Sequence, residues 1–407
     1  MLVCKAIIGV FKSLLKYHQL YSTMSCITVS DNYIAIAKNL QIDLYDYSSH
    51  KIVEIPITAN PQENDRLTDI VVSSDSKYLA TITSISKQLI LYDLPISTAP
   101  KIFLLPRSAS KIRFTVRNSQ ILVADKSGDV LIYDLVQEGT SGTKLLGHLS
   151  LLLDVLQTAD EKFIITSDRD EKIKVSCYPN TYNIQTYCLG HREFVNHIEL
   201  LPHNDKFLIS SSGDGVVKIW NYAEGNVCNS IITYNDVNDT HLKDNFTKKM
   251  DEEGIEVETL PVVHLTVTKI NDHTSLIAVC VHTYNTILIY NVTNSSDYKL
   301  SHKLETKLNL DHFPTSILFY NSKLFVYIES ECSITFYNFT SSNDTVNFEK
   351  CEVEIFFENV SKMQSNGIEN YFESIKLLYK RKFDNVQEYQ ERKKQRLEKT
   401  AIKMFVE

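Results

Sequence analysis

The sequence predicts an all-β fold of seven repeated units, and three observations support this prediction. Short apolar runs that end in an aromatic residue recur through most of the 407 residues. Their aromatic positions lie 41 to 47 residues apart, except for a single interval of 70. Each run also follows a second strand-like run and a turn of Gly, Asp, Asn or Ser residues. Units of about 40–45 residues with four short strands are typical of β-propeller blades.

The units follow one another through the strand that carries the repeated aromatic position. Alternating apolar residues between turn residues indicate antiparallel strands. Five units have Tyr at this position, the fourth has Ser176, and the fifth has Trp220, the single Trp of the chain. The seven runs are 42–46, 89–93, 130–134, 173–176, 217–220, 287–290 and 334–337. We therefore expect a seven-bladed propeller over residues 24–357.

Composition limits the classes of protein to which the chain can belong. It is 43% hydrophobic and 23% charged, which is usual for a soluble globular protein. The net charge of −8 argues against a chain that coats nucleic acid over its whole surface, but it allows a local basic patch. No apolar run is long enough for a membrane span. The eight Cys form no C-x-x-C pair, which fits reduced thiols in the cytosol or nucleus.

The first 23 residues have two interpretations. They contain Lys5, Lys12 and Lys16 but no acidic residue, as a mitochondrial-type leader or a weak signal peptide would. The alternative, which we favour, is that translation begins at Met24, because strand-like sequence follows it directly.

Units four and five carry the motif that identifies the type of blade. Unit five has Gly190-His191 and then Asp214 six residues before Trp220, which resembles the WD-repeat pattern. Unit four has the corresponding His148 and Asp170. A buried His in this pattern bonds the turn Asp and a strand Ser, and the aromatic side chain completes the network. We therefore expect these residues to stabilise blades rather than to catalyse: His148, Asp170, His191, Asp214 and Trp220.

The 70-residue interval contains a polar insert at 234–260. Its polarity and lack of periodicity predict a mobile surface loop between blades five and six. A docking element is the alternative.

Residues 358–407 form a C-terminal extension with helical spacing over 369–403. Ten Lys or Arg and four Asp or Glu lie between 376 and 403, so this segment carries +6 and the remainder −14. One interpretation is a solvated helix with i,i+4 ion pairs. The other is a basic arm that contacts RNA phosphates through Lys380, Arg381, Lys382, Arg392, Lys393, Lys394 and Arg396.

Motifs for catalysis or metal binding are missing from the sequence. It has no Gly-rich phosphate loop, no G-x-G-x-x-G turn, no H-E-x-x-H and no G-x-S-x-G. We therefore assign no catalytic residue, metal ligand or cofactor, and expect an interaction scaffold. A ubiquitin-ligase substrate receptor or a chromatin adaptor is the alternative, although no F-box-like helix precedes the blades. An enzyme ranks last.

Several stretches together resemble one WD-repeat family, the non-catalytic subunit of the eukaryotic tRNA (guanine-N7)-methyltransferase, in its fungal type. Generic WD repeats lack this set in this order, and the resemblance covers about residues 120–390. The stretches are 123–130, 146–155, 168–176, 189–195, 210–215 and 378–386.

This resemblance implies a division of labour between two chains. The partner would be a catalytic subunit that binds S-adenosylmethionine and forms N7-methylguanosine in the tRNA variable loop. The present chain would be its non-catalytic scaffold in a heterodimer, would contact tRNA through the complex, and would act in the nucleus and also in the cytoplasm. No membrane partner is implied.

The resemblance also implies a docking face in the region of blades three and four. Matched by motif, its charged residues are Lys126, Arg169, Glu171 and Lys174. Some family members have Arg at the last position, and Lys174 keeps the charge but loses the bidentate fork. Arg169 could also be an ordinary surface charge beside the turn, but we favour the contact role.

Overall fold

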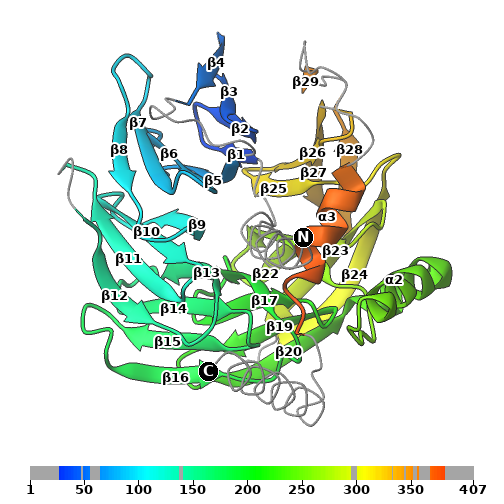
Figure 1. The fold of residues 1–407 in the computed structure, drawn as a ribbon. Helices are drawn as coiled ribbons and strands as arrows, with labels where there is room; N and C mark the ends of the chain where they lie inside the picture. The colour runs from blue at the N-terminus through cyan, green and yellow to red at the C-terminus, as the bar shows by residue number, and fades with distance from the viewer. Residues whose placement is uncertain are drawn as a thin grey trace, which may run out of the picture.

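The fold is a ring of seven antiparallel sheets, as the sequence predicts (Figure 1). The computed structural model describes residues 27–46, 49–55, 65–136, 141–294, 300–331, 333–342, 345–351, 355–356 and 367–380. The predicted leader or alternative start at 1–23 lies outside these residues. Within the described part of the chain, no helix is long and apolar enough to cross a membrane.

Each sheet is one blade of four consecutive strands, and β29 (Ile355–Phe356) adds to the last blade. Blades one to four are β1 (Ile27–Val29), β2 (Ile34–Lys38), β3 (Gln41–Tyr45), β4 (His50–Glu54); β5 (Leu67–Val72), β6 (Tyr78–Thr83), β7 (Gln88–Asp93), β8 (Lys101–Leu104); β9 (Ala109–Phe114), β10 (Gln120–Asp125), β11 (Asp129–Asp134), β12 (Thr143–Gly147); and β13 (Leu152–Gln157), β14 (Phe163–Asp168), β15 (Ile173–Cys177), β16 (Ile184–Cys188). Blades five to seven are β17 (Val195–Leu200), β18 (Phe207–Ser212), β19 (Val216–Asn221), β20 (Asn226–Ile232); β21 (Val262–Asn271), β22 (Thr274–Val281), β23 (Thr286–Asn294), β24 (Leu300–Asn309); and β25 (Ser316–Tyr320), β26 (Lys323–Ile328), β27 (Ser333–Ser342), β28 (Thr345–Lys350).

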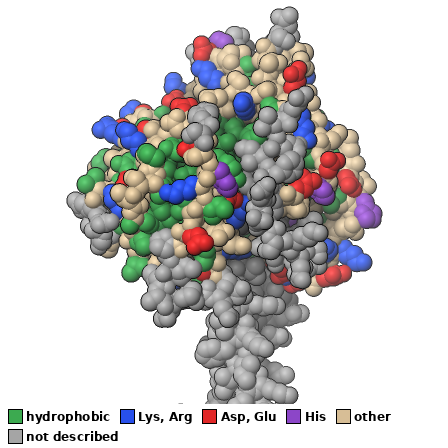
Figure 2. Space-filling view, turned by 90° about the horizontal axis from the view of Figure 1, so that it is seen from above, with side chains coloured by type: hydrophobic (Ala, Val, Ile, Leu, Met, Phe, Trp, Pro, Cys, Tyr) green, Lys and Arg blue, Asp and Glu red, His purple; other side chains and the backbone are tan. Residues whose placement is uncertain are grey.

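Packing between blades determines which strands are apolar throughout. The second strand of a blade is covered on both faces by the neighbouring blades, and β22 is buried at every position. The fourth strand lies at the rim, and β16 is largely exposed. The rim seen from above carries interspersed acidic and basic side chains, with hydrophobic side chains gathered between them (Figure 2).

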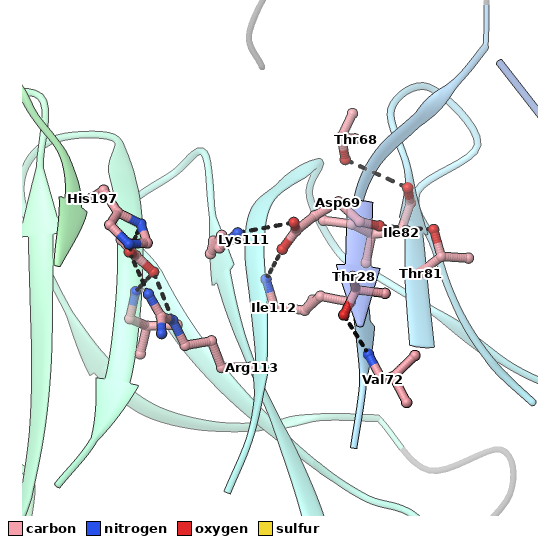
Figure 3. Close-up of polar contacts among 12 residues, drawn as sticks. Thr28, Thr68, Asp69, Val72, Thr81, Ile82, Lys111, Ile112, Arg113 and His197 are labelled. Carbon is pink, nitrogen blue, oxygen red and sulfur yellow. Dashed lines mark hydrogen bonds and ion pairs between the residues drawn. The ribbon is translucent and has the colours of Figure 1, made fainter. Parts of the chain in front are cut away.

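Side chains on the innermost strands tie each blade to the next. Thr28 Oγ1 accepts a hydrogen bond from the Val72 amide at 3.1 Å, and Asp69 Oδ2 accepts one from the Ile112 amide at 2.9 Å (Figure 3). Equivalent side-chain bonds to the backbone of the following blade come from Ser110, Asp154, Asn196 and Thr266. These bonds hold the blades in a fixed angular relation.

Blades seven and one close the ring by packing. The phenol of Tyr320 donates a hydrogen bond to Asp31 Oδ1 at 2.8 Å across this junction. Beneath it lies an apolar cluster that both blades share, formed by Ile27, Ile36, Phe325, Tyr327, Ile334 and Phe336.

The expectation that the insert is a mobile loop was wrong. A 3-10 helix, η1 (Thr233–Asp236), is followed by α2 (Thr240–Glu252), where the Asp239 side chain caps the helix by accepting a hydrogen bond from the Leu242 amide. Phe246 and Met250 lie four residues apart on one side of α2 and are buried. The helix was missed because these two side chains are a weak periodic signal within a polar segment.

The described part of the C-terminal extension contains a helix, α3 (Gly367–Lys376), which overlaps the region where helical spacing is predicted. Ile375, Leu378 and Tyr379 are buried in the same hydrophobic cluster as α2. Residues 381–407, and with them six of the seven basic residues assigned to RNA contact, lie outside the described residues.

Candidate functional site

All four sequence-predicted docking residues belong to blades three and four. Because the strands of a blade alternate in direction, the turns between second and third strands share one face with the crossings from blade to blade. We call this the connection face. Lys126 follows β10, Arg169 and Glu171 lie between β14 and β15, and Lys174 is in β15.

A buried network fixes the connection face in blade five. His191 Nδ1 lies 2.9 Å from Asp214 Oδ2, and its Nε2 lies 2.8 Å from Ser210 Oγ. The indole of Trp220 donates to the same Ser210 oxygen at 2.8 Å. Burial would raise the pKa of Asp214, but the hydrogen bond and charge of His191 and two backbone hydrogen bonds together outweigh it, and the pKa is lowered. This is the WD-repeat arrangement that the motif predicts.

In blade four, the assignment of the turn aspartate to Asp170 was wrong. His148 Nδ1 contacts Asp168 Oδ2 at 2.9 Å, and His148 Nε2 contacts Thr166 Oγ1 at 2.7 Å. Asp168 Oδ1 also accepts the amides of Asp170 and Lys172, at 2.9 and 3.0 Å. Asp168 is the last residue of β14, a position at which blade five has Ser212. Asp170 lies six residues before Ser176, as Asp214 does before Trp220, so this spacing selects Asp170 although Asp168 makes the contact. Asp170 is left at the surface of the turn.

Arg169 is held at this rigid turn without a side-chain partner among the described residues. Its amide donates to the Leu151 carbonyl at 2.9 Å, which fixes the backbone. Its Nε is buried and makes no hydrogen bond with the described residues. A buried guanidinium nitrogen without an acceptor costs free energy.

The two acidic residues that follow Arg169 are engaged by the C-terminal extension. Lys380 Nζ donates to Glu171 Oε1 at 2.7 Å and lies 3.5 Å from Asp170 Oδ1. Burial would lower the pKa of Lys380, but the hydrogen bond and charge of Glu171, followed by those of Asp170, raise it. Glu171 has a left-handed backbone, with φ of 71°. Lys380 is therefore part of this site, a role that its place in a basic tail did not indicate.

The other two predicted docking residues are less accessible. Lys174 is 6% exposed, and its Nζ donates to the Gly147 carbonyl at 2.6 Å. Burial lowers its pKa. Lys126 is partly buried, and burial, followed by the charge of Arg66, lowers its pKa to about 8. A docking role for Lys174 stays a prediction, and its substitution will also disturb blade four.

Two exposed leucines on the connection face were missed by the sequence interpretation. Leu149 is fully exposed on the crossing from blade three to blade four, and Leu189 is 60% exposed on the crossing from blade four to blade five. They bracket blade four, whose turn carries Arg169. Their position next to the Gly-His pairs, which lie on the crossings between blades, could have indicated that they are on this face.

The chain was compared with known proteins. Residues 137–333 match the family model described as the tRNA methyltransferase TRM82 WD40 domain. A tRNA (guanine-N(7)-)-methyltransferase non-catalytic subunit wuho from Drosophila ananassae is 32% identical over 340 residues, 81% of this chain and 76% of that protein. Its counterpart from Culex quinquefasciatus is 33% identical over 300 residues, 72% of this chain and 66% of that protein. The WDR4 subunit of Mus musculus is 39% identical over 162 residues, 40% of this chain and 39% of that protein.

Solved structures support the fold. The chain superimposes on the structure of U3-55K with a TM-score of 0.57 at 18% identity, covering 77% of this chain and 90% of that one. For the RRP9 WD40 repeats the TM-score is 0.57 at 19% identity, covering 77% and 89%. At such identities these likenesses show the propeller alone.

Proposed function

Because this chain belongs to the family of tRNA (guanine-N(7)-)-methyltransferase non-catalytic subunits, we propose that it binds the catalytic subunit through the connection face of blade four. The bound S-adenosylmethionine and the methyl transfer would belong to that partner. The rigid propeller would hold the partner in its active shape and help to place the tRNA.

The observation that carries this proposal is that the Arg169 side chain makes no hydrogen bond or ion pair with the described residues. Arginine presents a planar fork that matches a carboxylate in two hydrogen bonds. A carboxylate of the catalytic subunit would pair with the outer nitrogens of the guanidinium, whereas Nε itself is buried. The exposed Leu149 and Leu189 on either side would contribute apolar contact. A central Arg with apolar neighbours is a frequent arrangement of binding hot spots.

The test is association of the purified full-length chain with the purified catalytic subunit. Arg169→Ala should weaken the complex about tenfold or more. Arg117→Ala is the matched control, because Arg117 lies in the β9–β10 connection at the opposite face and pairs with Glu161 at 2.8 Å. Lack of association by the unaltered chain would refute the proposed function. Equal affinities of the two variants would refute the docking site.

We propose further that the C-terminal extension contacts tRNA. Lys380, the last described residue, contacts the blade-four turn of the connection face, and most of the basic residues of the extension follow it in sequence. Removal of 388–407 should weaken tRNA binding by the complex and make its salt dependence shallower, because fewer counterions are released. Unchanged affinity and unchanged salt slope would exclude this role.

A further inference from the structure

We propose that residues 372–380, here called the C-terminal anchor, are part of the docking surface and that Lys380 is a positioning residue for Arg169. By occupying Asp170 and Glu171, Lys380 keeps the Arg169 guanidinium available to a carboxylate of the catalytic subunit. This inference rests on the proposed function and adds to it a role for the insert.

The charges of the turn explain why Lys380 is needed. Arg169 stands in the string Asp168-Arg169-Asp170-Glu171, so three carboxylates neighbour it in sequence. Asp168 is occupied by His148 and by two backbone amides. Asp170 and Glu171 are within ion-pair distance of Lys380. Without Lys380, these two carboxylates would attract Arg169 into an internal pair and compete with any partner.

The anchor holds Lys380 in place through its immediate neighbour. The Tyr379 hydroxyl donates to the Gly213 carbonyl at 2.7 Å, in the turn of blade five. Its ring meets Phe194 edge-on, with centroids 5.0 Å apart. Tyr379 is buried, and burial raises its pKa well above the ordinary value, so the hydroxyl keeps its proton. Because Lys380 directly follows the fixed Tyr379, its backbone is held close to Asp170 and Glu171.

Helix α2 of the insert also packs against the C-terminal anchor. Phe246 contacts Phe372 and Tyr379, with ring centroids 6.1 and 6.4 Å apart. Lys376 Nζ pairs with Glu253 Oε1 at 3.0 Å, just beyond the end of α2. Figure 1 shows α3 beside β23 and β28, in blades six and seven, with the chain after it running towards β19 of blade five; α2 projects from the side of the ring near β24. The insert, which precedes blade six, thus helps to position Lys380 at the turn of blade four.

The kind of partner follows from the remaining charge. Lys380 offsets one of the two negative charges of Asp170 and Glu171, so these two carboxylates together with Arg169, Lys380 and the exposed Lys172 carry a net charge of +1. The cation available at this surface for a partner is Arg169, so the surface fits a carboxylate with an apolar border. A catalytic subunit whose docking patch is acidic would be recognised, and a nucleic acid would not be selected by the leucines.

The decisive experiment is a double-mutant cycle on heterodimer affinity in the full-length chain. Lys380→Ala should weaken binding of the catalytic subunit about tenfold, because Arg169 is drawn into an internal pair. In an Arg169→Ala background the same substitution should change affinity less than about twofold, since its target is gone. Lys248→Ala, on the exposed side of α2, is the control and should leave affinity unchanged.

A second variant separates positioning from folding. Tyr379→Phe removes the hydroxyl bond to Gly213 but keeps the buried ring, so the thermal unfolding midpoint should change little while affinity falls. Full affinity of Lys380→Ala, or equal losses with and without Arg169, would overturn the inference while leaving the proposed function intact. Failure of the unaltered chain to bind would instead refute the proposed function itself.

Discussion

Lys380 and Glu171 are separated by 209 residues in sequence, yet their side chains meet at 2.7 Å. This contact joins the C-terminal anchor to the turn that carries Arg169. It also connects two segments that the sequence interpretation assigned to different tasks, one to RNA and one to the protein partner. A single ion pair on a surface contributes little to stability, commonly under about 1 kcal/mol. The proposed importance of this ion pair is therefore that it leaves the Arg169 guanidinium available to the catalytic subunit.

The corrected turn aspartate leads to a direct comparison of two neighbouring residues. Asp168→Asn should lower the free energy of unfolding by about 1–3 kcal/mol, because the charged acceptor of His148 and two amides is lost. Asp170→Asn is the matched control and should change it by less than about 0.5 kcal/mol. Urea denaturation followed by circular dichroism measures both. Equal effects would mean that spacing, and not the observed contact, identifies the structural aspartate.

Trp220 offers a test of the blade-five network. Trp220→Phe removes the donor to Ser210 and leaves a cavity in a fully buried position, so we expect a loss of about 2–4 kcal/mol. Tyr182→Phe, at an exposed turn, should be neutral. Both are measured by chemical denaturation with circular dichroism, because Trp220 is the only Trp available for fluorescence. A loss below about 1 kcal/mol would contradict the role of this network.

Helix α2 should contribute to stability as a packed element. Met250 is completely buried, so Met250→Ala should cost about 2–5 kcal/mol. Asp244→Ala on the exposed side of the same helix should cost less than about 0.5 kcal/mol. Thermal unfolding of the two variants provides the comparison. A mobile, solvated insert would instead make both substitutions neutral.

The inner strands predict a dependence of stability on pH (Figure 3). His197 lies 3.1 Å from Asp154 Oδ2 and 3.2 Å from Glu199 Oε2. Burial would lower the pKa of His197, but hydrogen bonds to Asp154 and Glu199 outweigh it and the pKa is raised. Its stabilising contribution is therefore complete below the unfolded pKa of about 6.5 and is lost as pH rises through the folded value.

The check is the free energy of unfolding measured from pH 5 upward. The unaltered chain should lose stability as His197 deprotonates, and His197→Gln should remove that component of the pH dependence. His241→Gln, on the exposed surface of α2, is the control. If the His197→Gln profile keeps the full slope of the unaltered chain, another group causes it.

The fold could be predicted from the sequence because each blade repeats one local pattern. The motif around His191, Asp214 and Trp220 reports contacts within one blade, where spacing along the chain determines proximity. Spacing failed at Asp168, since two aspartates two residues apart both satisfy the motif approximately. It also failed at Lys380, because a contact across 209 residues depends on how the anchor packs against α2. Such tertiary contacts leave no periodic signal.

The junction between blades seven and one has a consequence for the order of events during synthesis. The two blades that meet at this junction are the first and the last in the sequence, so the ring closes only after blade seven has left the ribosome. The anchor is translated later still, and it completes the surface around Arg169 last. A nascent or prematurely ended chain therefore lacks the finished surface. Association with the catalytic subunit would then serve as a check that the whole polypeptide has been made and closed.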